Sequence, residues 1–313
     1  MRPGFSIIFL TTLIGAGQGL FLALYGAELA ARLGLLGATP QPLFFVGGAL
    51  LSLVFTGLGA IASLFHLGHP ERAWRAMAMW RTSWLSRDGI AMLGFMGLLT
   101  LYGGAHYVAS PASVALGALT ALLCVALFVC TSMIYACIRF LQEWAHPLTV
   151  VNYVVLGCAS GFTLATAFAA FAAPTLVGIY GLAAIGLTAL GLLSRSAALV
   201  RNGRIRHRSS LQSAIGIHHP RIVQKSQGLM GGSYNTREFF HGRKRSVLRS
   251  VKWFFLATAF VLPVLLLGAG IAAASASLLC AAFVLQYGGL LAERWFFFAQ
   301  ANHPQNLYYQ TIS

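Results

Sequence analysis

The sequence predicts an all-α integral membrane protein, a bundle of eight transmembrane helices, and three observations support this prediction. First, 58% of the 313 residues are hydrophobic, only 9% are charged, and the mean hydropathy is +0.76, values that exclude an ordinary soluble domain. Second, the apolar residues form eight runs of about 20 residues or more, enough to cross about 30 Å of hydrocarbon. Third, these runs are continuous rather than alternating, which favours helices over a β-barrel.

The first apolar run is predicted to be a helix rather than a cleavable signal, because it is too long for a signal-peptide core and lacks a small-residue cleavage site. The other runs follow in order along the chain. The predicted spans are Phe5 to Arg32, Pro42 to His66, Trp84 to Val108, Pro111 to Ile138, Leu148 to Phe171, Thr175 to Leu199, Val251 to Ile271 and Ala273 to Phe298.

The basic residues lie almost entirely on one side of this predicted topology. With eight helices, both termini and the even-numbered loops share a side, and that side holds most of the lysine and arginine behind the net charge of +15. Short basic loops tend to stay in the cytoplasm, so both termini are predicted to be cytoplasmic. The charge suits anionic lipid and an acidic partner surface. No nucleic-acid partner is expected, because no recognisable binding fold accompanies it.

The chain divides into helices 1 to 6 (1–200), a basic loop (201–250) and helices 7 and 8 with a short tail (251–313). The loop is polar and basic but also contains apolar residues and glycine turn signals. Loops of this length are usually functional or disordered. We interpret it as a cytoplasmic element that docks a partner, with a solvated linker as the alternative. The residues chosen for docking are Arg221, Lys225, Arg237, Phe239 and Phe240.

The segment Ile61–Gly89 joins the second predicted span to the third and gathers histidine, acidic and arginine residues at one membrane edge. Polar clusters are costly there and are functional by default. Imidazole alternates between proton donor and acceptor near neutral pH, so His66 and Asp88 are predicted to transfer protons to or from a quinone. The alternatives are a histidine that anchors a helix end and a carboxylate that favours a helix N-terminus. Arg87 and Trp84 are assigned to the same quinone site, and Trp84 is interpreted as a wall of its pocket. The arginines of this segment are interpreted first as topology and headgroup anchors, one of which is expected to pair with Asp88; they are Arg72, Arg75, Arg81 and Arg87.

A few other polar residues fall within the spans. Gln18 is predicted to hydrogen-bond between helices, Glu293 to pair with an arginine across helices, and Glu28 to pair with Arg32 one turn on. These groups are too few and too scattered for an ion path, so a transporter or channel is the alternative function rather than the preferred one.

Haem is not expected, because no two histidines are predicted to face each other at mid-membrane depth. The five cysteines lie in apolar runs without metal-ligand spacing and are interpreted as buried hydrophobes. No metal ligand is therefore assigned in this chain.

Two stretches carry a resemblance to a known family. AIASLFHLGHPERAWRA (60–76), followed by SWLSRD (83–88), resembles the membrane anchor subunit of dimethyl sulfoxide reductase and its polysulfide-reductase-like relatives. LLAERWFFFAQANHPQNLYY (290–309) resembles the closing helix of that family. By motif position, the family's quinol-site histidine falls on His66 and its acidic residue on Asp88, where many relatives carry glutamate.

The resemblance implies a non-catalytic anchor in a bacterial cytoplasmic (inner) membrane. The expected partners are an iron-sulfur (ferredoxin-like) subunit and a molybdopterin catalytic subunit, which hold those cofactors, and the quinone pool; the anchor itself has no covalent cofactor and no catalytic residue. The loop stretches SLQSAIGIHHPRIVQKSQG (210–228) and GGSYNTREFFHG (231–242) are similar to a branch of the family associated with cytoplasmic sulfite-oxidising complexes. The substrate stays open between sulfite and an S-oxide or N-oxide.

Overall fold

The computed structural model describes residues 4–37, 39–65, 67–205, 210–223, 225 and 245–303. Eight helical spans in this part of the chain are long and apolar enough to cross a membrane, as the sequence predicts. They are α1 (Phe5–Arg32), α2 (Pro42–Leu64), α3 (Trp84–Tyr107), α4 (Ser113–Ala136), α5 (Pro147–Ala172), α6 (Val177–Gly203, preceded by η2, Pro174–Leu176), a seventh span made of α9 (Arg245–Leu256), η3 (Ala257–Val261) and α10 (Leu262–Ala272), and α11 (Ala276–Ala299).

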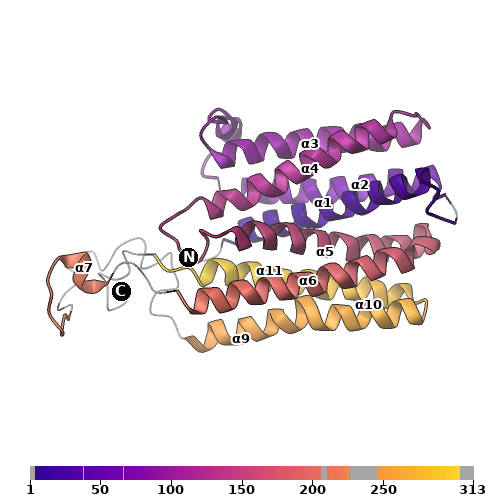
Figure 1. The fold of residues 1–313 in the computed structure, drawn as a ribbon. Helices are drawn as coiled ribbons and strands as arrows, with labels where there is room; N and C mark the ends of the chain where they lie inside the picture. The colour runs from indigo at the N-terminus through magenta and orange to yellow at the C-terminus, as the bar shows by residue number, and fades with distance from the viewer. Residues whose placement is uncertain are drawn as a thin grey trace.

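The helices run side by side as two groups (Figure 1). The group α1 to α4 packs through α1 against α2 and through α3 against α4, and the second group packs α5 against α6 and α11 against α10. The two groups meet mainly where α1 crosses α5. A Cβ atom at Gly161 of α5 would collide with the backbone of Gly19 in α1, so small residues allow this close contact.

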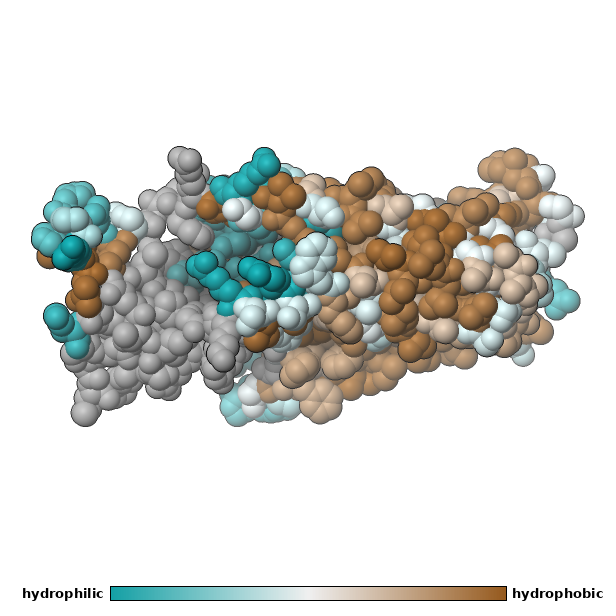
Figure 2. Space-filling model, turned by 90° about the horizontal axis from the view of Figure 1, so that it is seen from below, coloured by the Kyte–Doolittle hydropathy of each residue, from teal (hydrophilic) through white to brown (hydrophobic). Residues whose placement is uncertain are grey.

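The helices begin and end at two membrane faces. We call the face where α1, α3, α5 and α9 begin the loop end, because the basic 201–250 segment leaves the bundle there, and we call the other the far end. On the face shown in Figure 2, hydrophobic surface covers the bundle between the ends, whereas hydrophilic surface gathers toward the loop end. Large apolar side chains such as Leu122, Leu182 and Val284 are more than two-thirds exposed, as expected of residues that face lipid.

The helix boundaries differ from prediction chiefly around the basic loop. α6 continues to Gly203 and α9 begins at Arg245, so both helices extend into the range 201–250 that the sequence assigns to the loop. Arg245, Arg249 and Lys252 make the start of α9 amphipathic, which hides it from a search for continuous apolar runs. Long basic side chains can extend toward water from a helix of this kind.

Candidate functional site

The sequence-predicted site begins where α3 begins. Ser83 is the N-cap of this helix, and its hydroxyl oxygen accepts a hydrogen bond from the Ser86 amide at 3.4 Å. The Ser86 hydroxyl donates to the carbonyl oxygen of Ala76 in η1 (Pro70–Met77), which holds that short helix against α3. Asp88 therefore lies in the second turn of α3, close to η1, the short helix that packs against the start of α3 at the membrane edge. His66, the predicted proton partner, lies outside the described residues.

Asp88 is buried, with 6% of its surface exposed. One carboxylate oxygen accepts a hydrogen bond from the hydroxyl of Thr131 in α4, whose single hydrogen is shared with the Leu127 carbonyl oxygen of its own helix, 2.9 Å from the hydroxyl oxygen. Among the described residues no arginine, lysine or histidine forms an ion pair with Asp88. A buried carboxylate with a hydroxyl partner and no counter-ion is well suited to take up and release a proton.

Arg87 contacts the turn before α3 rather than Asp88. Its guanidinium donates to the carbonyl oxygens of Trp80 at 2.9 Å and Arg81 at 2.7 Å, and it stacks over the Trp84 ring at 4.5 Å. The expected pairing with Asp88 is absent from the described contacts, because Arg87 points to the loop that precedes α3. Arg87 and half-buried Trp84 therefore fix the conformation of the 78–83 turn.

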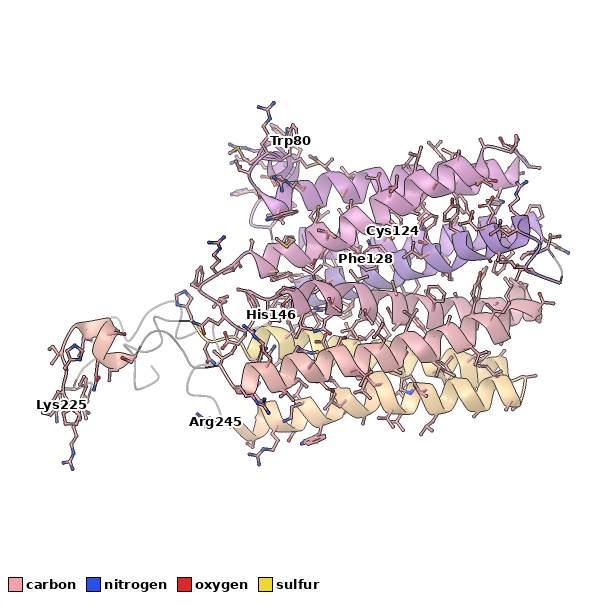
Figure 3. All side chains as sticks on the ribbon, in the orientation of Figure 1. Trp80, Cys124, Phe128, His146, Lys225 and Arg245 are labelled. Atoms are coloured by element: carbon pink, nitrogen blue, oxygen red, sulfur yellow. The ribbon has the colours of Figure 1, made fainter. Side chains whose placement is uncertain are left out.

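A small cavity adjoins Thr131 where α1, α4, α5 and α11 meet. Its volume is about 20 Å³, and Gln18, Ser160 and Arg294 contribute polar groups to its lining. This is room for about one water molecule. Gln18 also donates to the Cys124 carbonyl at 2.8 Å, which confirms the predicted hydrogen bond between helices. Cys124 and Phe128 point from α4 toward this centre of the bundle (Figure 3).

A buried charge cluster lies beside this cavity. The Arg195 Nε atom in α6 is 2.7 Å from Oε1 of Glu293 in α11, and Arg294 Nε is 3.9 Å from the other carboxylate oxygen. Arg294 also covers the Tyr153 ring at 3.8 Å. The predicted partner of Glu293 across helices is therefore Arg195, a residue that sequence reasoning did not single out although it is a cation in the predicted sixth span.

A second cavity of about 10 Å³ adjoins this cluster, and Arg294 and Glu143 are among the residues that line it. His146 also lines this cavity and is the N-cap of α5, where its Nδ1 atom accepts from the Leu148 amide at 3.1 Å. Partial burial and the nearby Arg201 guanidinium hold the pKa of His146 below its ordinary value. The imidazole is therefore neutral at pH 7 and able to accept this bond.

The predicted docking residues lie partly in the described structure. Arg221 and Lys225 are exposed and follow α7 (Leu211–Ile215), a single turn that Ser210 and Ser213 cap reciprocally. Lys225 lies with α7 beyond the loop end of the bundle (Figure 3). Arg237, Phe239 and Phe240 lie outside the described residues.

One predicted ion pair is wrong. Glu28 does not pair with Arg32; its carboxylate accepts from the Ser113 hydroxyl at 2.6 Å and lies 3.3 Å from Nε2 of His106. Glu28 faces α3 and α4 inside the bundle, whereas Arg32 is exposed at the end of α1. Within the described part of the chain, no group of three or more histidine, cysteine and acidic side chains is placed to hold a metal ion.

Two comparisons with known proteins agree with this architecture. The sequence model of the DMSO reductase anchor subunit (DmsC) family matches residues 2–300. The chain is also 50% identical to a subunit of the sulfite dehydrogenase of Allochromatium vinosum over 327 aligned positions, which cover 100% of both chains.

Proposed function

This chain belongs to the DMSO reductase anchor subunit family, and from that premise we propose that it is the membrane anchor and quinone-reactive subunit of a molybdopterin oxidoreductase complex. The match spans the bundle from the first helix to the last, which supports the anchor function over a transporter or channel. The observation that supports a quinone site is Asp88, a buried carboxylate hydrogen-bonded to Thr131 at a membrane edge.

Sulfite oxidation is the reaction that we assign to the complex, with S-oxide or N-oxide reduction as the second candidate. The relative at 50% identity belongs to a sulfite dehydrogenase, and identity at this level extends over the whole chain. In that direction sulfite and water yield sulfate, two protons and two electrons. The molybdopterin subunit would perform this step, and the iron-sulfur subunit would pass the electrons directly to a quinone bound in the anchor.

Quinone needs two electrons and two protons to become quinol. The electrons come from the iron-sulfur subunit, and the anchor supplies the binding site and the protons. We assign His66 to hydrogen-bond the quinone oxygen and to donate a proton, and Asp88 to re-supply it. Thr131 keeps one oxygen of Asp88 hydrogen-bonded in both protonation states, because a hydroxyl both donates and accepts. In the reductase direction the same groups would accept protons from quinol.

Replacing His66 with alanine tests this assignment. We expect quinone-dependent turnover of the purified complex to fall about 100-fold, because general acid–base groups contribute about that much or more. Turnover with a water-soluble electron carrier should not change, since it bypasses the anchor. Replacement of exposed His69, which pairs with Glu71 at 3.0 Å, is the matched control and should leave both activities intact. Loss of the soluble subunits from the H66A complex would contradict a purely chemical role.

The 201–250 loop is proposed to dock the soluble subunits. We expect replacement of 211–242 with an uncharged linker of equal length to release them from the membrane at moderate salt, because the linker removes basic and apolar contacts without changing topology. The measurement is the ratio of molybdenum to anchor in washed membranes. Replacing both Arg221 and Lys225 with serine should lower the ratio of molybdenum to anchor by a smaller amount, with the same salt dependence. Full retention of molybdenum by the linker variant would disprove this role.

The loop end is proposed to face the cytoplasm of a bacterial inner membrane, because the basic residues gather there. A fluorescent protein that matures only in the cytoplasm should therefore fluoresce when fused after Ser313, and alkaline phosphatase, active only outside, should be inactive there. Fusions at Ser110, in the far-end loop between α3 and α4, should behave in the opposite way. The reverse pattern would place the complex on the outer face of the membrane.

A further inference from the structure

A buried carboxylate that the quinone site does not use lies at the loop end of the bundle. Glu143 is in the segment between α4 and α5 and is 7% exposed. The side-chain amide of Asn302 donates to its Oε1 atom at 3.1 Å, whereas its Oε2 atom has no hydrogen-bond partner among the described residues. An unpaired carboxylate oxygen is costly to bury. The cavity of about 10 Å³ that Glu143 lines has room for about one water molecule, which would pair with this oxygen.

The charges around this cavity favour the ionised form of Glu143. Glu293 balances only one of the guanidinium groups of Arg195 and Arg294, so the buried charge cluster has one cation in excess. The charged and titratable side chains that line the cavity with Glu143 are His146 at the N-cap of α5, Arg195 and Arg201 in α6, and Glu293 and Arg294 in α11. A proton on Glu143 removes a negative charge from beside these cations, so Glu143 releases it readily.

Two side chains line both this cavity and the cavity of about 20 Å³ beside Thr131. They are Tyr153 and Arg294. The hydroxyl of Thr131 in turn hydrogen-bonds Asp88. Groups that donate and accept hydrogen bonds therefore follow one another from Glu143, past Tyr153, to Thr131 and Asp88.

We propose that Glu143 is the entry point for the protons that quinone reduction consumes, and that the hydroxyl groups of Tyr153 and Thr131 relay these protons to Asp88. This role rests on the quinone site proposed above. Each quinone takes two electrons from the iron-sulfur subunit and two protons, so two protons follow the route in each turnover, one after the other. They come from the loop end, where His146 also lies (Figure 3).

Arg294 explains why the route uses hydroxyl groups. Its guanidinium lies 3.8 Å over the Tyr153 ring, so a free hydronium ion in either cavity would be repelled. A hydroxyl group accepts one hydrogen as it gives up another, and no net charge stays on its oxygen. The contact with Arg294 also holds the Tyr153 ring in place.

Replacing Glu143 with glutamine (Glu143→Gln) tests this route in the purified complex. Glutamine keeps an oxygen that accepts from Asn302 but does not take up a proton near neutral pH. The measured quantity is the ratio of quinone-dependent turnover to turnover with a water-soluble electron carrier. We expect this ratio to fall about tenfold at about pH 8, because protons then reach Asp88 only by slower paths. Glu71→Gln, at an exposed carboxylate, is the matched control and should leave the ratio unchanged.

The pH profile separates a proton entry point from a structural residue. In the Glu143→Gln complex we expect the ratio to rise by up to about tenfold for each unit by which the pH falls, because the rate then follows the concentration of protons in water. The unmodified complex should show a flatter profile. A ratio that is lowered by the same factor at every pH would overturn the proposal.

Tyr153→Phe is a second variant, which keeps the ring beneath Arg294 and removes the hydroxyl group. We expect the same rising profile, and this result tests the route even if the Glu143→Gln complex fails to assemble. If Asp88→Asn lowers the ratio and neither of these variants does, the quinone site stands and the route is wrong. If Asp88→Asn also leaves the ratio unchanged, the proposed quinone site fails together with the route.

Discussion

Replacing Asp88 with asparagine (Asp88→Asn) is expected to lower the rate of quinone-dependent electron transfer about 100-fold. The side-chain amide keeps the shape of the carboxylate, and its oxygen can still accept from the Thr131 hydroxyl, so the packing of α3 against α4 is preserved. An amide does not take up a proton near neutral pH. The variant therefore removes proton transfer while leaving the hydrogen bond, which isolates the chemical role of Asp88.

Two activities of the same purified complex measure this effect. Turnover with a quinone analogue reports the whole path, and turnover with a water-soluble electron carrier reports the molybdopterin and iron-sulfur subunits alone. Thr131→Val is the matched control, since it keeps the carboxylate and removes its hydroxyl partner. We expect a smaller loss from Thr131→Val than from Asp88→Asn. Equal quinone turnover in the asparagine variant and the unmodified complex would leave Asp88 as no more than a favourable charge at a helix start.

Replacing Glu293 with glutamine (Glu293→Gln) is expected to lower the free energy of unfolding by about 3–5 kcal/mol, which is the usual result of breaking a buried ion pair. Glu293 is 1% exposed and is the only carboxylate that forms an ion pair with Arg195 or Arg294 within the described part of the chain. Its removal leaves two buried guanidinium groups without a counter-ion. The bundle then has to hold two like charges away from water.

The variant Arg195→Met provides the informative comparison with Glu293→Gln. It removes one cation from a cluster of two cations and one carboxylate, and Arg294 remains 3.9 Å from Glu293. We expect it to destabilise the complex less than Glu293→Gln, although both variants disrupt the same contact. Thermal unfolding midpoints of the detergent-solubilised complex measure the order. Glu71→Gln, at an exposed pair, should change the midpoint little, because such pairs contribute about 0–1 kcal/mol. The reverse order for Arg195 and Glu293 would mean that Arg195 stabilises the bundle mainly through its contacts with Phe255 and Phe296.

Some residues of the predicted site are close together in the sequence, whereas others come together only in the folded structure. The motif that contains Asp88 is visible in the sequence because the start of α3, its Ser83 cap and the acidic residue lie within six positions of each other. Thr131 is 43 residues away and is one of several threonines in apolar runs, so no sequence pattern marks it as the partner. The sequence alone could therefore identify His66 and Asp88 as residues proposed to transfer protons. It could not identify Thr131, whose hydroxyl hydrogen-bonds Asp88.

The sequence by itself determined the class of protein, the eight spans and the side on which the charge gathers. It could do so because hydrocarbon requires about 20 consecutive apolar residues per helix and penalises charge at every position, so the signal is local. Only the tertiary structure decided how the buried charges pair. Glu28 and Arg32 are one turn apart and suited to each other, yet Glu28 turns inward to His106 and Ser113 while Arg32 stays at the membrane surface. The physical reason is that a buried carboxylate must find its partners on the helices that enclose it, and the packing of α1 against α3 and α4 sets which these are.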